Sequence, residues 1–148
     1  MIRKKDVIEY ILSILRSNTK LLEKELKSIN DEKNSITKSS SGDKHETSRA
    51  LMQSEFEKIY NNYQSQLNHL KVIESLDISD KSKIGLGSLI ETDSSILFIG
   101  IGLGIHHIDK RKVLIVSKAS PIGKQIDGKE EGDYIFLNDN KEKIIRIS

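Results

Sequence analysis

The chain has 148 residues, of which 36% are hydrophobic and 31% are charged, and its formal net charge is +2. This charge-rich composition suits a molecule with much surface for its mass, and the small net charge by itself requires no nucleic-acid partner. The absence of cysteine excludes a disulfide framework, a thiolate nucleophile and a thiolate zinc site.

The N-terminal segment is basic and then partly apolar, but Asp6, Glu9 and Arg16 interrupt its apolar residues. A secretory signal needs an apolar run of roughly 7–15 residues, and a membrane-spanning helix needs about 20. The N-terminal segment contains no such signal run, and no stretch of about 20 apolar residues occurs in the sequence, so we expect a cytoplasmic protein with no membrane partner.

Glycine and proline divide the chain in two, because only Gly42 of the nine glycines precedes Gly85 and the single proline is Pro121. Before residue 77, apolar residues recur at steps of mostly three and four, which predicts two amphipathic helices of coiled-coil type. The two series are Val7, Ile11, Ile14, Leu15, Leu22, Leu26 and Ile29, and then Met52, Phe56, Ile59, Tyr63, Leu67, Leu70 and Ile73.

The segment NSITKSSSG between the two helices has the composition of a turn. We therefore expect residues 1–76 to form an antiparallel coiled-coil hairpin with its tip near 33–49. The second helix, over about residues 43–76, would be about 50 Å long.

After a linker at 77–83, β-branched residues dominate, and SLIET, SILFIGI, VLIVS, YIFLN and KIIRI predict five short strands. Before the fourth strand, Ser120 is typical of a helix N-cap, Pro121 of a first helical position and Gly128 of a helix end. Residues 84–148 are thus expected to form a small domain of the α+β class.

Asp43 and Glu46, in the tip sequence SGDKHE, lie three residues apart at the expected start of the second helix. Asp at an N-cap with Glu at N3 is the pattern of a capping box. The same spacing places both carboxylates on one face of the first turn, where they can point at one cation. Two carboxylates are too few for a Mg²⁺ site alone, but they can supplement a site that already holds metal.

Two stretches of the sequence resemble the Gre family of bacterial transcription elongation factors. SPIGKQIDGKEEGD, from Ser120 to Asp133, is similar to the family's Ser-Pro-Ile segment followed by Gly-Lys-Glu-Glu, and GDKHE keeps the Gly-Asp-x-x-Glu of the family's coiled-coil tip. The order of elements is similar over nearly the whole chain. The resemblance implies a small FKBP-like antiparallel β domain with one short helix after the hairpin, and it marks Ser120, Pro121, Ile122, Gly128 and Lys129 as the docking-domain motif.

The resemblance further implies that the hairpin enters the secondary channel of RNA polymerase while the C-terminal domain docks at the channel rim. Asp43 and Glu46 would be the catalytic, metal-binding acids, which help hold the second Mg²⁺ and orient a water so that the polymerase cleaves its own backtracked RNA. The polymerase remains the enzyme, and the Mg²⁺ belongs to its active site. The implied partners are RNA polymerase, the nascent RNA 3′ end and DNA within the elongation complex, and the chain is expected to be a monomer.

The sequence departs from the family's usual tip, Gly-Asp-Leu-Ser-Glu-Asn-Ala-Glu-Tyr, because Lys44 and His45 replace the middle pair. Four positive charges surround the tip, those of Lys33, Lys38, Lys44 and Arg49. They would contact RNA phosphates or acidic channel walls, or remain solvated. The added positive charge supports an alternative function, a channel-binding modulator or inhibitor that does not stimulate cleavage. A structural coiled-coil adaptor is a third possibility.

Other sequence signals favour structural roles. IGIGLG lacks the Lys-Ser/Thr of a phosphate loop and is better explained as a strand or bulge. His106 and His107 would face opposite sides of a strand, so they are not expected to share an ion. The C-terminal half holds only three aromatic residues, Phe98, Tyr134 and Phe136, which are too few for the cleft of a prolyl isomerase.

Overall fold

The computed structural model describes the backbone of residues 1–37 and 43–148, and the side chains of residues 1–35 and 46–148. In chain order its elements are α1 (Lys4–Thr37), α2 (Asp43–Glu74), β1 (Leu89–Thr92), β2 (Ile96–Gly100), β3 (Gly104–Ile108), β4 (Arg111–Ser117), α3 (Pro121–Ile126), β5 (Tyr134–Leu137) and β6 (Asn140–Ile147). They form two compact units, Ser13–Leu70, and Met1–Leu12 together with Lys71–Ser148. Within the described ranges, no helix combines the length and the apolar character that crossing a membrane requires.

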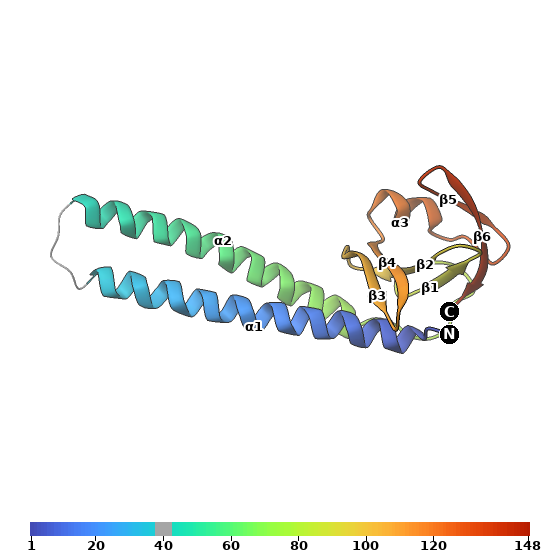
Figure 1. Ribbon diagram of the computed structural model, residues 1–148, viewed down its shortest axis with the longest axis horizontal. Helices are drawn as coiled ribbons and strands as arrows, with labels where there is room; N and C mark the ends of the chain where they lie inside the picture. The colour runs from blue at the N-terminus through green and yellow to red at the C-terminus, as the bar shows by residue number, and fades with distance from the viewer. Residues whose placement is uncertain (38–42) are drawn as a thin grey trace. The chain divides into compact units, whose positions relative to one another are not determined.

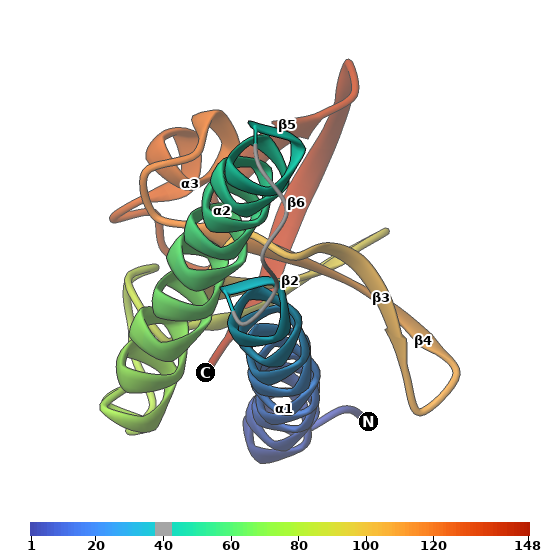
Figure 2. The same cartoon turned by 90° about the vertical axis from the view of Figure 1, so that its left-hand side faces the viewer.

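In the unit Ser13–Leu70, α1 and α2 run side by side as the expected helical hairpin (Figures 1 and 2). The predicted seam positions of α1 in this unit are buried or half-buried, and those of α2 are half-buried. Thr19 occupies the seam between Leu15 and Leu22 and is only 6% exposed. Its hydroxyl donates to the carbonyl of Arg16 at 2.9 Å, so a polar residue completes the seam without an unpaired donor.

Among the described residues, six strands, not five, form one sheet in the order β3-β4-β2-β1-β6-β5. The α+β class with one short helix is confirmed, but the expected antiparallel pairing is wrong in one place, because β2 and β4 are parallel. The cause is β3, which the sequence patterns did not predict. Since β3 adds a reversal between β2 and β4, these two strands run in the same direction.

A two-residue turn at Asp109 and Lys110 joins β3 to β4, and both residues have positive φ, 49° and 64°. This backbone matches the type I′ turn that favours tight hairpins. The two histidines of β3 point to opposite sides, as expected: His107 is exposed and His106 is half-buried. His106 Nε2 donates to the carbonyl of Leu103 at 3.1 Å, so its Nδ1 accepts the 2.9 Å hydrogen bond from the hydroxyl of Tyr10.

One face of the sheet carries an apolar core beneath α3. Its buried members are Ile84, Ile90, Leu97, Ile99, Val116, Ile126, Ile135, Leu137, Ile144 and Ile147. Phe98 alternates with Leu97 and Ile99 and is fully buried on the opposite face. There the end of α2 approaches closely, since a Cβ added to Gly100 would lie 3.2 Å from Cδ1 of Ile73. Both faces of the sheet are therefore covered at β2, in the middle of the sheet.

Candidate functional site

The acidic pair of the tip lies where the sequence predicts, at the start of the second helix. α2 begins at Asp43, so Asp43 and Glu46 occupy its first turn three residues apart. Glu46 is exposed to solvent. Lys38 lies outside the described residues, as do the side chains of Asp43 and Lys44, so capping and metal binding by Asp43 both stay predictions.

Two basic side chains lie close to Glu46. A shallow depression of about 350 Å³ is lined by Lys33 of α1 and by Glu46, Arg49, Ala50 and Gln53 of α2. The structure thus brings together two residues of the predicted basic tip, Lys33 and Arg49, with one of its acids. A carboxylate beside two cations can bind a phosphate-bearing ligand through the cations or a metal through its own oxygens.

Lys33 is held in place from the opposite helix. Its ammonium group donates to Oε1 of Gln53 and lies 5.8 Å from the centre of the Phe56 ring. The amide nitrogen of Gln53 in turn donates to Glu57 at 3.1 Å. Sequence reasoning did not foresee this chain of contacts, because its two ends come from different helices and no local pattern joins them.

The two carboxylates of the tip suit a Mg²⁺ ion only as an addition to a metal site that has other ligands. Mg²⁺ prefers oxygen ligands, and aspartate and glutamate supply them. Among the side chains that the structure describes, no group of three or more histidines and acids is placed to hold a metal ion. Asp43 and Glu46 would therefore add carboxylates to a metal whose other ligands come from elsewhere.

The second predicted site, the motif from Ser120 to Lys129, forms α3 and the turn after it. Ser120 is the N-cap: its hydroxyl accepts from the Gly123 amide at 3.0 Å and donates to the Ser117 carbonyl at 2.7 Å. Pro121 begins the helix, as predicted. Gly123 was missed by the sequence analysis, yet a Cβ there would lie 2.1 Å from the Ser117 carbonyl oxygen, so no other residue fits without a backbone shift.

The end of the motif is hydrogen-bonded to Ile84, which directly follows the linker. Gly128 follows the C-cap Asp127 with φ of +77°, and its amide donates to the carbonyl of Ile84 at 2.8 Å. The carbonyl of Lys129 accepts from the Ile84 amide at 2.9 Å. Ile122 is half-buried against the apolar core. The predicted docking residues therefore shape the domain, and Lys129 contributes its backbone to that shape.

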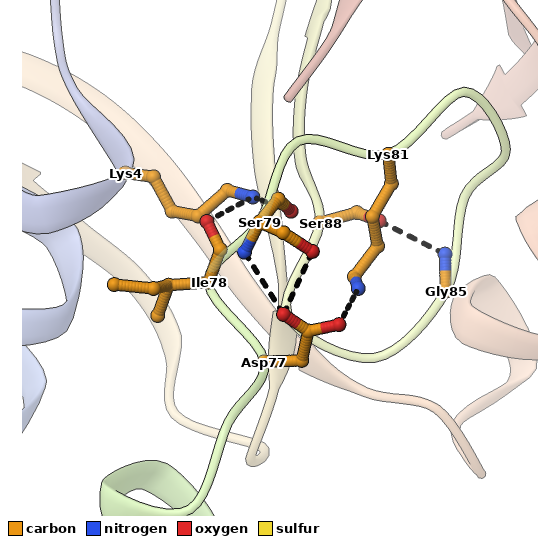
Figure 3. A network of polar contacts seen from close by, with 7 residues as sticks. All are labelled: Lys4, Asp77, Ile78, Ser79, Lys81, Gly85 and Ser88. Carbon is orange, nitrogen blue, oxygen red and sulfur yellow. Dashed lines mark hydrogen bonds and ion pairs between the residues drawn. The ribbon is translucent and has the colours of Figure 1, made fainter.

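A polar network that the sequence did not reveal orders the segment after α2 (Figure 3). Asp77 accepts hydrogen bonds from the amide and hydroxyl of Ser79, at 3.0 and 2.7 Å, and from Lys81 at 3.3 Å. These contacts lower the pKa of Asp77 to about 2, and the hydrogen bonds from Ser79 contribute most to this shift. Lys4 of α1 donates to the carbonyls of Ile78 and Ser79 at 3.4 and 3.0 Å.

Residues 1–12, this segment and the C-terminal sheet thus form one compact unit. The other unit, the helical hairpin Ser13–Leu70, carries exposed acidic and basic side chains. A comparison with solved structures finds proteins that are similar to this chain. The GreA factor homolog 1 (Gfh1) protein of Thermus thermophilus is 19% identical, with 93% of this chain and 94% of that chain covered and a TM-score of 0.36.

A second structure, of the transcription factor Gfh1, is 19% identical over 92% of both chains, with a TM-score of 0.35. Thermus aquaticus Gfh1 is 17% identical, with 89% of this chain and 94% of that chain covered and a TM-score of 0.33. No family model matches the chain, and no curated protein matches it. Similarity at this level shows no function by itself.

Proposed function

We propose that this chain is a transcription elongation factor that binds RNA polymerase through its secondary channel and stimulates cleavage of backtracked RNA. The observation that carries the proposal is the acidic first turn of α2, where Glu46 is exposed and Asp43 precedes it by three residues. The tip sequence GDKHE and the motif SPIGKQIDGKEEGD, both similar to the Gre family, support the same function.

The chemical role of the tip follows from its two carboxylates. When bound, Mg²⁺ of the polymerase supplies a nucleophilic water and stabilises the leaving oxygen of the phosphodiester. Asp43 and Glu46 would add negative oxygen ligands and hydrogen-bond acceptors beside that centre. Because the chain by itself supplies only this pair at the tip, we expect it to have no nuclease activity without the polymerase.

The experiment uses stalled, backtracked elongation complexes of the cognate polymerase with end-labelled RNA in Mg²⁺. Wild-type protein is compared with Asp43→Asn/Glu46→Gln, which removes both negative charges. Asparagine caps a helix about as well as aspartate, so this variant separates metal binding from capping. Asp31→Asn/Glu32→Gln is the matched control, because it removes two exposed acids of α1 that lie outside the tip pattern.

We expect the wild type and the control to shorten the RNA and the tip variant to slow cleavage at least about tenfold, as the loss of groups that support a metal site does. Equal cleavage by all three proteins would show that the acids only cap α2. Wild-type protein that fails to bind the polymerase at all would refute the proposed function as a whole.

A second function is favoured by the cations beside Glu46. Lys33 and Arg49 line the same depression, and their charge would oppose a bound Mg²⁺. The chain would then occupy the channel as a modulator or inhibitor without stimulating cleavage. In the same assay this function predicts intact RNA and slower incorporation of added nucleotide, and Arg49→Gln would relieve that inhibition.

A further inference from the structure

The β5–β6 hairpin presents an unusually apolar outer face. Tyr134 and Phe136 of β5 are 45% and 56% exposed, and Ile145 of β6 is 54% exposed. Their neighbours Ile135, Leu137 and Ile144 point the other way and are buried in the core, so alternation places the exposed residues together on the outer side. Clustered exposed apolar side chains of this size mark interaction surfaces more often than single exposed ones do.

Two lysines lie within this face. Cross-strand pairing places Lys143 opposite Tyr134 and Lys141 opposite Phe136, so each lysine is paired across the hairpin with an aromatic residue. The structure shows no ion pair for either lysine among the residues that it describes. The outer face of β5–β6 (Tyr134, Phe136, Lys141, Lys143 and Ile145) is thus both apolar and positively charged.

The backbone edge of β5 is already occupied. The side-chain amide of Gln125, from α3, donates to the carbonyl of Phe136 at 3.1 Å and accepts from the Phe136 amide at 2.7 Å. Gln125 therefore satisfies the groups that an added strand would use. A partner has to meet the side chains of the face and cannot extend the sheet at this residue.

The chemistry of the face favours a protein over a nucleic acid. A base would stack on an open aromatic ring, but the ammonium group of Lys141 lies 4.3 Å from the centre of the Tyr134 ring and covers one side of it. Carboxylates carried on a protein can pair with the lysines while apolar side chains cover the rings.

We propose that the outer face of β5–β6 is a docking surface for a protein segment that presents carboxylates beside apolar side chains. The surface belongs to the compact unit Met1–Leu12 with Lys71–Ser148 and involves none of the tip residues, so this inference holds or fails independently of the proposed function.

The test uses amide NMR spectra of the full chain during titration with peptides of repeated Leu-Leu-Glu-Glu units. Matched peptides carry glutamine or lysine in place of glutamate, and oligouridylate serves as the nucleic-acid probe. Phe136→Ser removes an aromatic anchor, and Lys141→Glu/Lys143→Glu reverses the charge. Ile105→Ser is the control, because Ile105 is also 54% exposed but lies on β3.

We expect the glutamate peptide to shift the signals of residues 134–145, and Phe136→Ser to weaken its binding about tenfold while Ile105→Ser leaves it unchanged. The charge-reversed variant should prefer the lysine peptide, and spectra that otherwise match the wild type will show that each variant is folded. Several results would overturn the proposal: no shift with any peptide, equal shifts regardless of peptide charge, or stronger shifts of the same residues with oligouridylate, which would make the face a nucleic-acid surface.

Discussion

Replacing Ser120 with alanine separates the two roles that the motif before β5 can have, contact with a partner and shape of the domain. The Ser120 hydroxyl makes two hydrogen bonds, with the Gly123 amide and the Ser117 carbonyl. Loss of an N-cap costs about 1 kcal/mol, and the second hydrogen bond contributes about 1 kcal/mol more. We therefore expect the free energy of unfolding to fall by about 2 kcal/mol, which lowers the melting temperature by about 4–8 °C.

The assay is urea unfolding followed by the amide NMR signals of β2 and β4, since the chain has no tryptophan and circular dichroism is dominated by the two long helices. Ser120→Thr is the control, because threonine keeps the capping hydroxyl and should change stability by less than about 0.5 kcal/mol. RNA cleavage is measured below the unfolding temperature and should match the wild type. Ser120→Ala protein that keeps its full stability but no longer binds polymerase would refute the structural role and make the hydroxyl a contact.

Two further predictions concern contacts made by the start of α1 and by the segment after α2, within the unit of Met1–Leu12 and Lys71–Ser148. Asp77→Asn should remove a pH-dependent part of the free energy of unfolding. The pKa of Asp77 is about 2 in the folded state and 3.8 ordinarily. The wild type therefore has the full stabilisation by the Asp77 carboxylate above about pH 4 and loses it as the pH falls through about 2. Urea midpoints measured across that range should fall less steeply for the variant, and parallel curves would contradict the role of the carboxylate. Tyr10→Phe removes the 2.9 Å hydrogen bond to His106 but keeps the ring, so it should cost about 0.5–1.5 kcal/mol in urea unfolding. The exposed Tyr60→Phe is its control, and equal midpoints for both variants would show that the bond contributes nothing.

The helical hairpin could be predicted in detail because its cause is local and repetitive. A seam repeated at steps of three and four, without glycine or proline, leaves few alternatives to two long helices. The observed α2 ends at Glu74, close to the expected end near residue 76. Thr19 was not predicted as part of the seam because its hydroxyl marks it as polar, and only the bond to its own helix makes it suitable for burial.

The sheet was harder to predict because its organisation depends on contacts between distant residues. β3 has the sequence GIHHI, and its glycine and two histidines give only a weak strand signal. Its place in the sheet comes from its pairing with β4. The parallel pairing of β2 with β4 follows only once β3 is known. The need for glycine at position 123 could not be predicted either. It arises from the Ser117 carbonyl, which leaves no room for a Cβ, and the sequence does not show that this carbonyl lies there.

At the tip, the sequence identifies the acids but not their electrostatic setting. Asp43 and Glu46 are recognisable because their spacing is local, whereas the placement of Lys33 near Glu46 depends on Gln53 of the facing helix. An exposed, mobile cation repels a nearby metal ion only weakly, because solvent screens the electrostatic interaction. Lys33 is instead tethered and half-buried, so its charge persists at the tip. If the chain has the proposed function, the balance between cleavage and channel blocking would therefore depend on a residue of α1 as much as on the acidic pair of α2.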